Sequence, residues 1–185
     1  MNALQLLPVA AEDFGRRVHA VAPDAWNAPT PCADWTVRDV VNHMVGEHLW
    51  APELLAGATV EEVGDRFEGD QVGDDPVGAW DRAIYDSLTA WSRTPPDRAV
   101  HLSFGPTPAA EYAEQMLVDL VVHGWDIARG ARLDERMDPD AVRHALEYVS
   151  ARAGELGGSG LFDDPVPVDS DDPQDRLLGL LGRRP

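Results

Sequence analysis

The feature that most constrains the fold is a helical repeat of apolar residues. In one segment, Ile84, Leu88 and Trp91 are spaced by four and then three positions. This spacing places them on one face of a helix, where they can pack against a neighbour. The same period predicts four long helices, over residues 3–22, 36–56, 76–93 and 108–130.

Local signals predict where these helices begin and end. Thr36 and Asp39 have the spacing of a capping box, with Asp in place of Glu, so the second helix begins there. Gly57 follows its last apolar residues and predicts its end. The pair Pro95-Pro96 ends the third helix. Gly130 is the predicted cap at the end of the fourth.

The rest of the chain is less regular. We expect a fifth helix from Asp138-Pro139 to about Ala153 and a short closing helix over residues 173–181. Residues 57–75 are acidic and glycine-rich, which predicts a mobile surface loop. The segment 99–104 is extended but too short to build a sheet alone, and 154–172 is an irregular excursion. Together these elements predict an all-α, up-down four-helix bundle with an additional C-terminal helix and an irregular tail, forming a single domain over residues 1–185.

Composition excludes several classes of protein. The net charge of -18 argues against a nucleic-acid partner, because phosphate would be repelled. All 15 basic residues are Arg, so lysine Schiff-base chemistry and a P-loop lysine are absent. The apolar runs are too short to cross a membrane. A single cysteine and no basic, apolar leader predict a cytoplasmic protein.

Two polar residues stand inside the apolar stretch 116–126. Asp119 and His123 lie one turn apart on one helix face, surrounded by Met116, Leu120 and Val122. Burying a carboxylate and an imidazole is costly unless a partner compensates them, and a divalent metal does so. A hydrogen bond between the two side chains explains the pair about as well.

The second helix offers a third ligand. His43 lies within the apolar stripe of Val40, Val41 and Met44, so we expect its ring to face inward. Three ligands from facing helices leave a fourth coordination position for water or substrate, as in catalytic zinc sites. Glu47 lies one turn further on. Its functional interpretations are a fourth ligand, a residue that orients a ligand, or a general base. A solvated glutamate is the simpler interpretation.

Three segments resemble a known family. Residues 30–43 (TPCADWTVRDVVNH) are similar to the N-terminal signature of the mycothiol-dependent maleylpyruvate isomerase metal-binding domain, in the DinB-like four-helix-bundle superfamily. Residues 122–129 (VHGWDIAR) resemble its second metal helix. Residues 172–183 (DPQDRLLGLLGR) are typical of one branch of these proteins. The similar regions touch most of the chain.

The resemblance implies a divalent ion, zinc first and nickel second, held by His43, Asp119 and His123. The isomerase has Glu at the position of Asp119. It also carries a separate C-terminal domain, which we do not expect within these 185 residues. The resemblance further implies mycothiol as a thiol co-substrate, a small electrophile as its partner and, by analogy with similar bundles, a homodimer.

Other polar and aromatic residues have simpler interpretations. We expect His48 to be solvated, Trp125 to pack, and Cys32 to be structural because no histidine or arginine pair is seen to activate it. Asp126 is a candidate to orient a ligand histidine. The arginines Arg38 and Arg129 either clamp an anionic substrate or form helix salt bridges.

Three functions remain open at this point. The leading one is a metal-dependent thiol S-transferase or isomerase, in which the ion lowers the pKa of the thiol that attacks a small electrophile. The second is a non-catalytic metal- or ligand-binding bundle, favoured by a closed site with Glu47 as the fourth ligand. The third is a metal-free structural domain.

Overall fold

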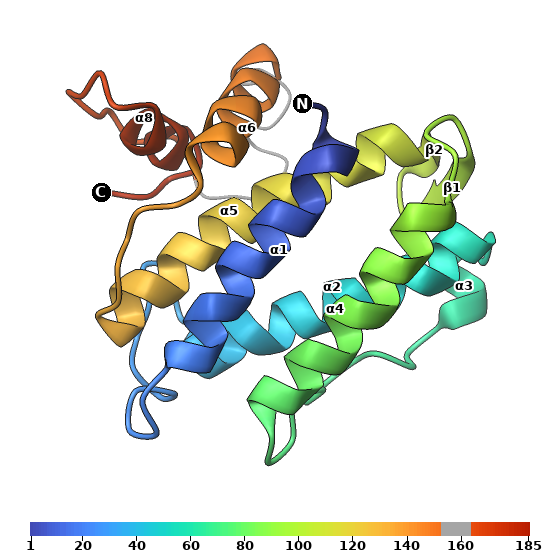
Figure 1. Ribbon diagram of the computed structural model, residues 1–185, viewed down its shortest axis with the longest axis horizontal. Helices are drawn as coiled ribbons and strands as arrows, with labels where there is room; N and C mark the ends of the chain where they lie inside the picture. The colour runs from blue at the N-terminus through green and yellow to red at the C-terminus, as the bar shows by residue number, and fades with distance from the viewer. Residues whose placement is uncertain (153–163) are drawn as a thin grey trace.

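The computed structural model describes residues 1–152 and 164–185, and its four long helices form a bundle (Figure 1). They are α1 (Ala3–Ala20), α2 (Val37–Ala56), α4 (Pro76–Arg93) and α5 (Ala109–Ala131). Helix α5 packs on α1 and α2, and α4 packs on the other side of the same two helices. The predicted all-α four-helix bundle is confirmed.

Two more helices cover one side of the bundle. Helix α6 (Pro139–Ala151) packs against α5 and α1, and α8 (Pro173–Leu180) packs against α6 (Figure 1). Both begin with proline in the first turn after an aspartate cap, at the positions that the sequence predicts. The predicted excursion 154–172 lies partly in 153–163, outside the described residues.

Helix ends follow local chemistry in most places. Both bonds of the capping box between Thr36 and Asp39 are present, and Gly57 ends α2 with a φ of 108°. The prediction of Gly130 as a cap is wrong, because Arg132 takes the left-handed position that ends α5. Gly130 lies inside the helix, where an added Cβ would come within 2.9 Å of the Val37 side chain. Because glycine has no side chain, α2 can pack closely against α5 at this position.

The region expected to be a mobile loop is partly ordered. It contains the short helix α3 (Val60–Val63), which begins with its own capping box. Asn42 and Arg38 of α2 then donate hydrogen bonds to the carbonyl oxygens of Gly69 and Gly73. Because this connection runs back along the bundle, α2 and α4 point in the same general direction, so the predicted up-down order does not hold between these two helices (Figure 1).

A small hairpin precedes α5. Strand β1 (Ala99–Leu102) pairs antiparallel with β2 (Gly105–Pro108), with Leu102 opposite Gly105. The sequence predicts only the first strand, because two prolines in four residues hide the second. Pro106 and Pro108 are tolerated since a two-stranded sheet consists of edges alone. The hairpin brings Leu102, Ser103 and Phe104 to the side of α5.

The core lies between the four long helices and continues beneath α6 and α8. Its largest buried side chains include Trp80, Trp125 and Phe14. Trp125 is 1% exposed, which confirms its expected role in packing. No helix within the described residues combines the length and the apolar character that crossing a membrane requires.

Candidate metal centre and cavity

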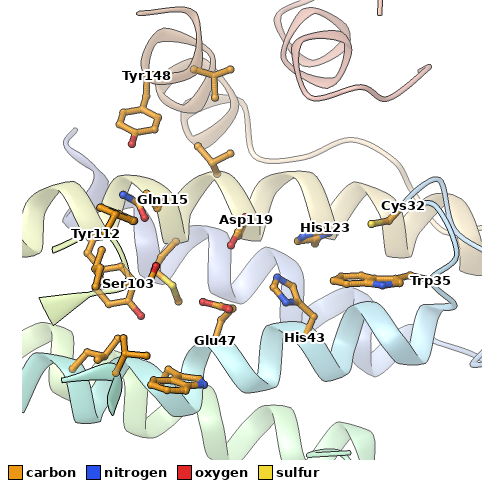
Figure 2. Close-up of a pocket in the computed structure, with 18 of the residues that line it drawn as sticks. Cys32, Trp35, His43, Glu47, Ser103, Tyr112, Gln115, Asp119, His123 and Tyr148 are labelled. Carbon is orange, nitrogen blue, oxygen red and sulfur yellow. The ribbon is translucent and has the colours of Figure 1, made fainter. Parts of the chain in front are cut away.

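A cavity of about 750 Å³ lies between α2, α5, α6 and the hairpin. This volume is in the range that binds small molecules in proteins. All three predicted ligands, His43, Asp119 and His123, are among the residues that line it. Figure 2 shows His43 pointing from α2 toward Asp119 and His123 on α5.

The two histidine rings have a spacing that suits a shared ion. The ring centres of His43 and His123 are 5.0 Å apart and nearly perpendicular, at 73°. Two imidazoles on one tetrahedral ion have ring centres about 5 Å apart, given metal–nitrogen distances near 2 Å. Trp35 covers both rings, with centre distances of 5.0 Å to His43 and 5.9 Å to His123.

The protonation of His43 also suits metal binding. Burial, together with the neighbouring His123, lowers the pKa of His43 to about 3. The ring is therefore neutral near pH 7, which is the form that ligates a metal. Burial raises the pKa of Asp119, while His123 and Arg183 act in the opposite direction. A divalent cation would compensate the buried carboxylate.

The Nδ1 atom of the His123 ring forms a hydrogen bond with a buried carboxylate. Its Nδ1 lies 3.0 Å from Asp126 Oδ2, one turn along α5, and Asp126 is fully buried. Arg183, near the C-terminus, donates to the same carboxylate from Nη2 at 2.9 Å. Burial would raise the pKa of Asp126, but the hydrogen bonds from His123 and Arg183 lower it overall. An ionised Asp126 keeps the proton on His123 Nδ1 and leaves Nε2 for an ion.

The predicted ligands are not the side chains whose potential ligand atoms cluster most clearly, because those of His43, Asp119 and His123 do not all lie within 4.8 Å of one another. Within the described residues, one potential ligand atom each of Cys32, His123 and Asp126 lies within 4.8 Å of the others. The expectation that Cys32 has no histidine neighbour is therefore wrong. Asp126 is poorly suited as a ligand, because both its oxygens already accept from Arg183. We retain His43, Asp119 and His123 as the predicted ligands, with Cys32 beside them (Figure 2).

Glu47 faces the cavity instead of solvent. It lies on α2 one turn after His43, and Figure 2 shows its carboxylate below Asp119. Burial, and then the charge of Asp119, raises its pKa to about 7. The simpler interpretation of Glu47 as a solvated residue is wrong, because the face of α2 that carries His43 also lines the cavity here.

His48 is the clearest failure of the sequence analysis among the histidines. It is fully buried, its Nδ1 lies 2.9 Å from Ser87 Oγ of α4, and its ring packs edge-on against Trp80. Burial lowers its pKa to about 3. It faces α4, while His43 faces α5, so it belongs to the core and not to the cavity.

The far end of the cavity is polar without being basic. Uncharged side chains with hydrogen-bonding groups line it, namely Ser103, Tyr112, Gln115 and Tyr148. Tyr112 is 4% exposed, and its hydroxyl has no hydrogen-bond partner within the described residues. The candidate anion clamps Arg38 and Arg129 instead pair with Asp70 and Glu135.

Comparison with known proteins identifies a related family. The profile of the family described as the mycothiol maleylpyruvate isomerase N-terminal domain matches residues 7–128. Uncharacterized proteins from two strains of Mycobacterium tuberculosis are 26% identical over 99% of this chain and 98% of their own length.

Two solved structures share the fold. They are crystal structures of the mycothiol-dependent maleylpyruvate isomerase and of a histidine-to-alanine mutant of it. Each has a TM-score of 0.61 and 16% identity, and the match covers 85% of this chain and 72% of the other. At this identity the likeness establishes the architecture alone.

Proposed function

The chain belongs to the mycothiol maleylpyruvate isomerase N-terminal domain family, and on that premise we propose that it is a metal-dependent thiol S-transferase or isomerase acting on a small electrophile. One observation carries the proposal. His43 and His123 reach from opposite helices into one cavity with ring centres 5.0 Å apart, beside the buried Asp119. Mycothiol, named in the family description, is the proposed thiol.

The residues present fit a divalent ion of the zinc type. The donor set is two imidazoles and one carboxylate, which leaves a position open for a co-substrate. When bound, the ion supplies the positive charge that lowers the pKa of a thiol near it. Zinc is the first candidate and nickel the second, since both accept nitrogen and oxygen donors.

The protein's own residues prepare this site. Asp126 and Arg183 fix the orientation of the His123 ring, and the Trp35 ring packs against both imidazoles. The remaining cavity volume lies toward the hairpin and α6, where an electrophile can bind next to the ion site. This arrangement places two reactants in contact and lowers the entropy cost of their reaction.

Metal analysis and a thiol assay test the proposal together. Protein purified without a histidine tag should contain about one equivalent of metal and should consume mycothiol in the presence of an electrophile. His43→Ala should lower both the metal content and the thiol consumption, because it removes one of the three ligands. Stoichiometric metal without thiol-dependent turnover, across several electrophiles, would contradict the transferase or isomerase activity. Absence of metal would contradict the whole proposal.

The alternative is a metal-binding bundle without enzymatic activity. Glu47 favours it, because its carboxylate faces the ligand group and could close the site as a fourth ligand. X-ray absorption spectroscopy on the metal-loaded protein distinguishes the two functions. Four protein ligands and no exchangeable water indicate a closed site, whereas three protein ligands and a water indicate an open one. A homodimer remains a prediction, which light scattering can check.

A further inference from the structure

The charges that line the cavity are unevenly distributed. Glu47 and Asp119 are the carboxylates, and Arg183 is the one guanidinium among the described lining residues. Arg183 is already engaged, because its Nε and Nη2 donate to the buried Asp126. Arg152, which packs on the Tyr148 ring, is likewise paired with Glu111. The undescribed residues 153–163 contain no basic side chain in their sequence.

This charge pattern disfavours an anionic substrate. A divalent ion would be neutralised by Asp119 and Glu47, and an ionised thiol co-substrate would make the site negative. A carboxylate entering such a site meets like charges within a few ångströms, in a partly buried setting where repulsion is stronger than in water. The protein's net charge of -18 acts in the same direction at longer range.

The uncharged groups of the cavity indicate what binds instead. Tyr112 is buried, and among residues 1–152 and 164–185 its hydroxyl has no hydrogen-bond partner, which costs free energy. Gln115 and Ser103 add donors and acceptors nearby (Figure 2). Leu102 and the exposed Phe104 supply apolar surface on the hairpin. A neutral molecule with amide, carbonyl or hydroxyl groups would match these features.

We propose that the cavity selects an uncharged, hydrogen-bonding electrophile and that Glu47 is the residue that rejects carboxylate substrates. This inference rests on the proposed function, because it takes the cavity as the substrate site. It also sets this chain apart from the isomerase with the same fold, whose name includes a carboxylate substrate, maleylpyruvate.

A matched pair of probes tests the charge preference. Maleamide and maleate share one carbon skeleton and are similar in size, so the largest difference between them is the negative charge of the two carboxylates. We expect NMR titration of the metal-free protein at about pH 8.5, above the pKa of about 7 that Glu47 has in its buried position, to give at least about tenfold tighter binding of maleamide. Equal affinity, tighter binding of maleate, or no binding of maleamide would overturn the proposal.

Variants assign the preference to particular residues. Glu47→Gln should reduce the ratio of the two dissociation constants by about tenfold, chiefly by improving maleate binding. Glu53→Gln, on the same helix but outside the cavity, is the matched control and should leave the ratio unchanged. An unchanged ratio in Glu47→Gln would remove this role from Glu47.

Tyr112→Phe tests the hydrogen-bonding part. It should weaken maleamide binding about fivefold, the value of one hydrogen bond, without lowering the melting temperature, because the part of the chain that the structure describes offers the hydroxyl no partner to lose. Tyr85→Phe, at an exposed tyrosine, is the control. Unchanged maleamide affinity in Tyr112→Phe would overturn this part.

These binding measurements need neither a metal nor a thiol. A protein that prefers maleamide but conjugates no thiol would retain this inference and lose the proposed function. A protein that conjugates thiols but binds maleate and maleamide with equal affinity would retain the proposed function and lose this inference.

Discussion

Helix α2 carries two buried histidines that face opposite sides and illustrate two uses of the same side chain. His43 faces α5 and the cavity, while His48 faces α4 and the sealed core. Burial lowers the pKa of both rings to about 3. A low pKa therefore does not distinguish a ligand from a core residue. The difference lies in the neighbours, which are a carboxylate and a second imidazole for His43, and a serine and a tryptophan for His48.

Alanine substitutions should separate the two histidines most strongly. His43→Ala removes a ligand and should lower metal affinity by roughly 100-fold, from about 3 kcal/mol per ligand. His48→Ala should keep the metal but lower the free energy of unfolding by about 2–4 kcal/mol, because it leaves a cavity beside Trp80. Metal analysis and chemical denaturation of both variants check this. Metal loss in His48→Ala alone would reverse the assignment.

The carboxylate behind His123 gives the next largest effect. Asp126→Asn should lower metal affinity about tenfold, because the His123 ring loses its charged partner. It should also lower the free energy of unfolding by about 2 kcal/mol, since Arg183 stays buried without a counter-charge. Competition with a chromophoric chelator measures the affinity, and Asp175→Asn on α8 is a control. Unchanged affinity would contradict the orienting role.

The buried Glu47 predicts that the free energy of unfolding of the metal-free protein depends on pH. The pKa of Glu47 is raised from 4.5 to about 7, so the folded state binds its proton more tightly than the unfolded state. Stability from this group is fully present below pH 4.5 and is lost as the pH rises through 7. After allowance for partial exposure, the loss is about 2 kcal/mol.

Glu47→Gln should remove most of this dependence, as denaturation between pH 4.5 and 8 can measure. Glu53→Gln should not change it. Bound metal should also weaken it, because the cation favours the ionised carboxyl. A pH profile that is unaffected by Glu47→Gln would show that Glu47 has ordinary access to solvent.

The smallest expected effect comes from a substitution on the α4 side of α2, next to His48. Ser87→Ala removes the hydroxyl that lies 2.9 Å from His48 Nδ1 and should lower the free energy of unfolding by about 1 kcal/mol. Metal affinity should not change, since Ser87 lies on α4 and away from the cavity. Thermal denaturation and metal titration of one variant measure both quantities. A change in affinity would indicate that the two faces of α2 are coupled.

Local sequence signals predicted most of the helices well, because their causes act over a few residues. The capping box of Thr36 and Asp39, the proline at the start of α6, and the apolar period all depend on near neighbours. The hairpin was missed in part, since β2 has two prolines. The end of α5 was predicted to within one residue, but its capping residue was wrong, because Gly130 allows close helix packing and Arg132 takes the left-handed position.

The sequence by itself determined that Asp119 and His123 share one face of a buried helix, because four residues make about one turn. It also placed His43 among apolar residues, and the family motifs linked the three. Only the tertiary structure decided which side chains join them. Arg183 reaches Asp126 across 57 positions, Cys32 arrives from a loop, and Glu47 faces the cavity while His48 does not. These contacts depend on which helix faces pack together. The packing of the whole apolar core determines those faces, because it involves residues far apart in the sequence.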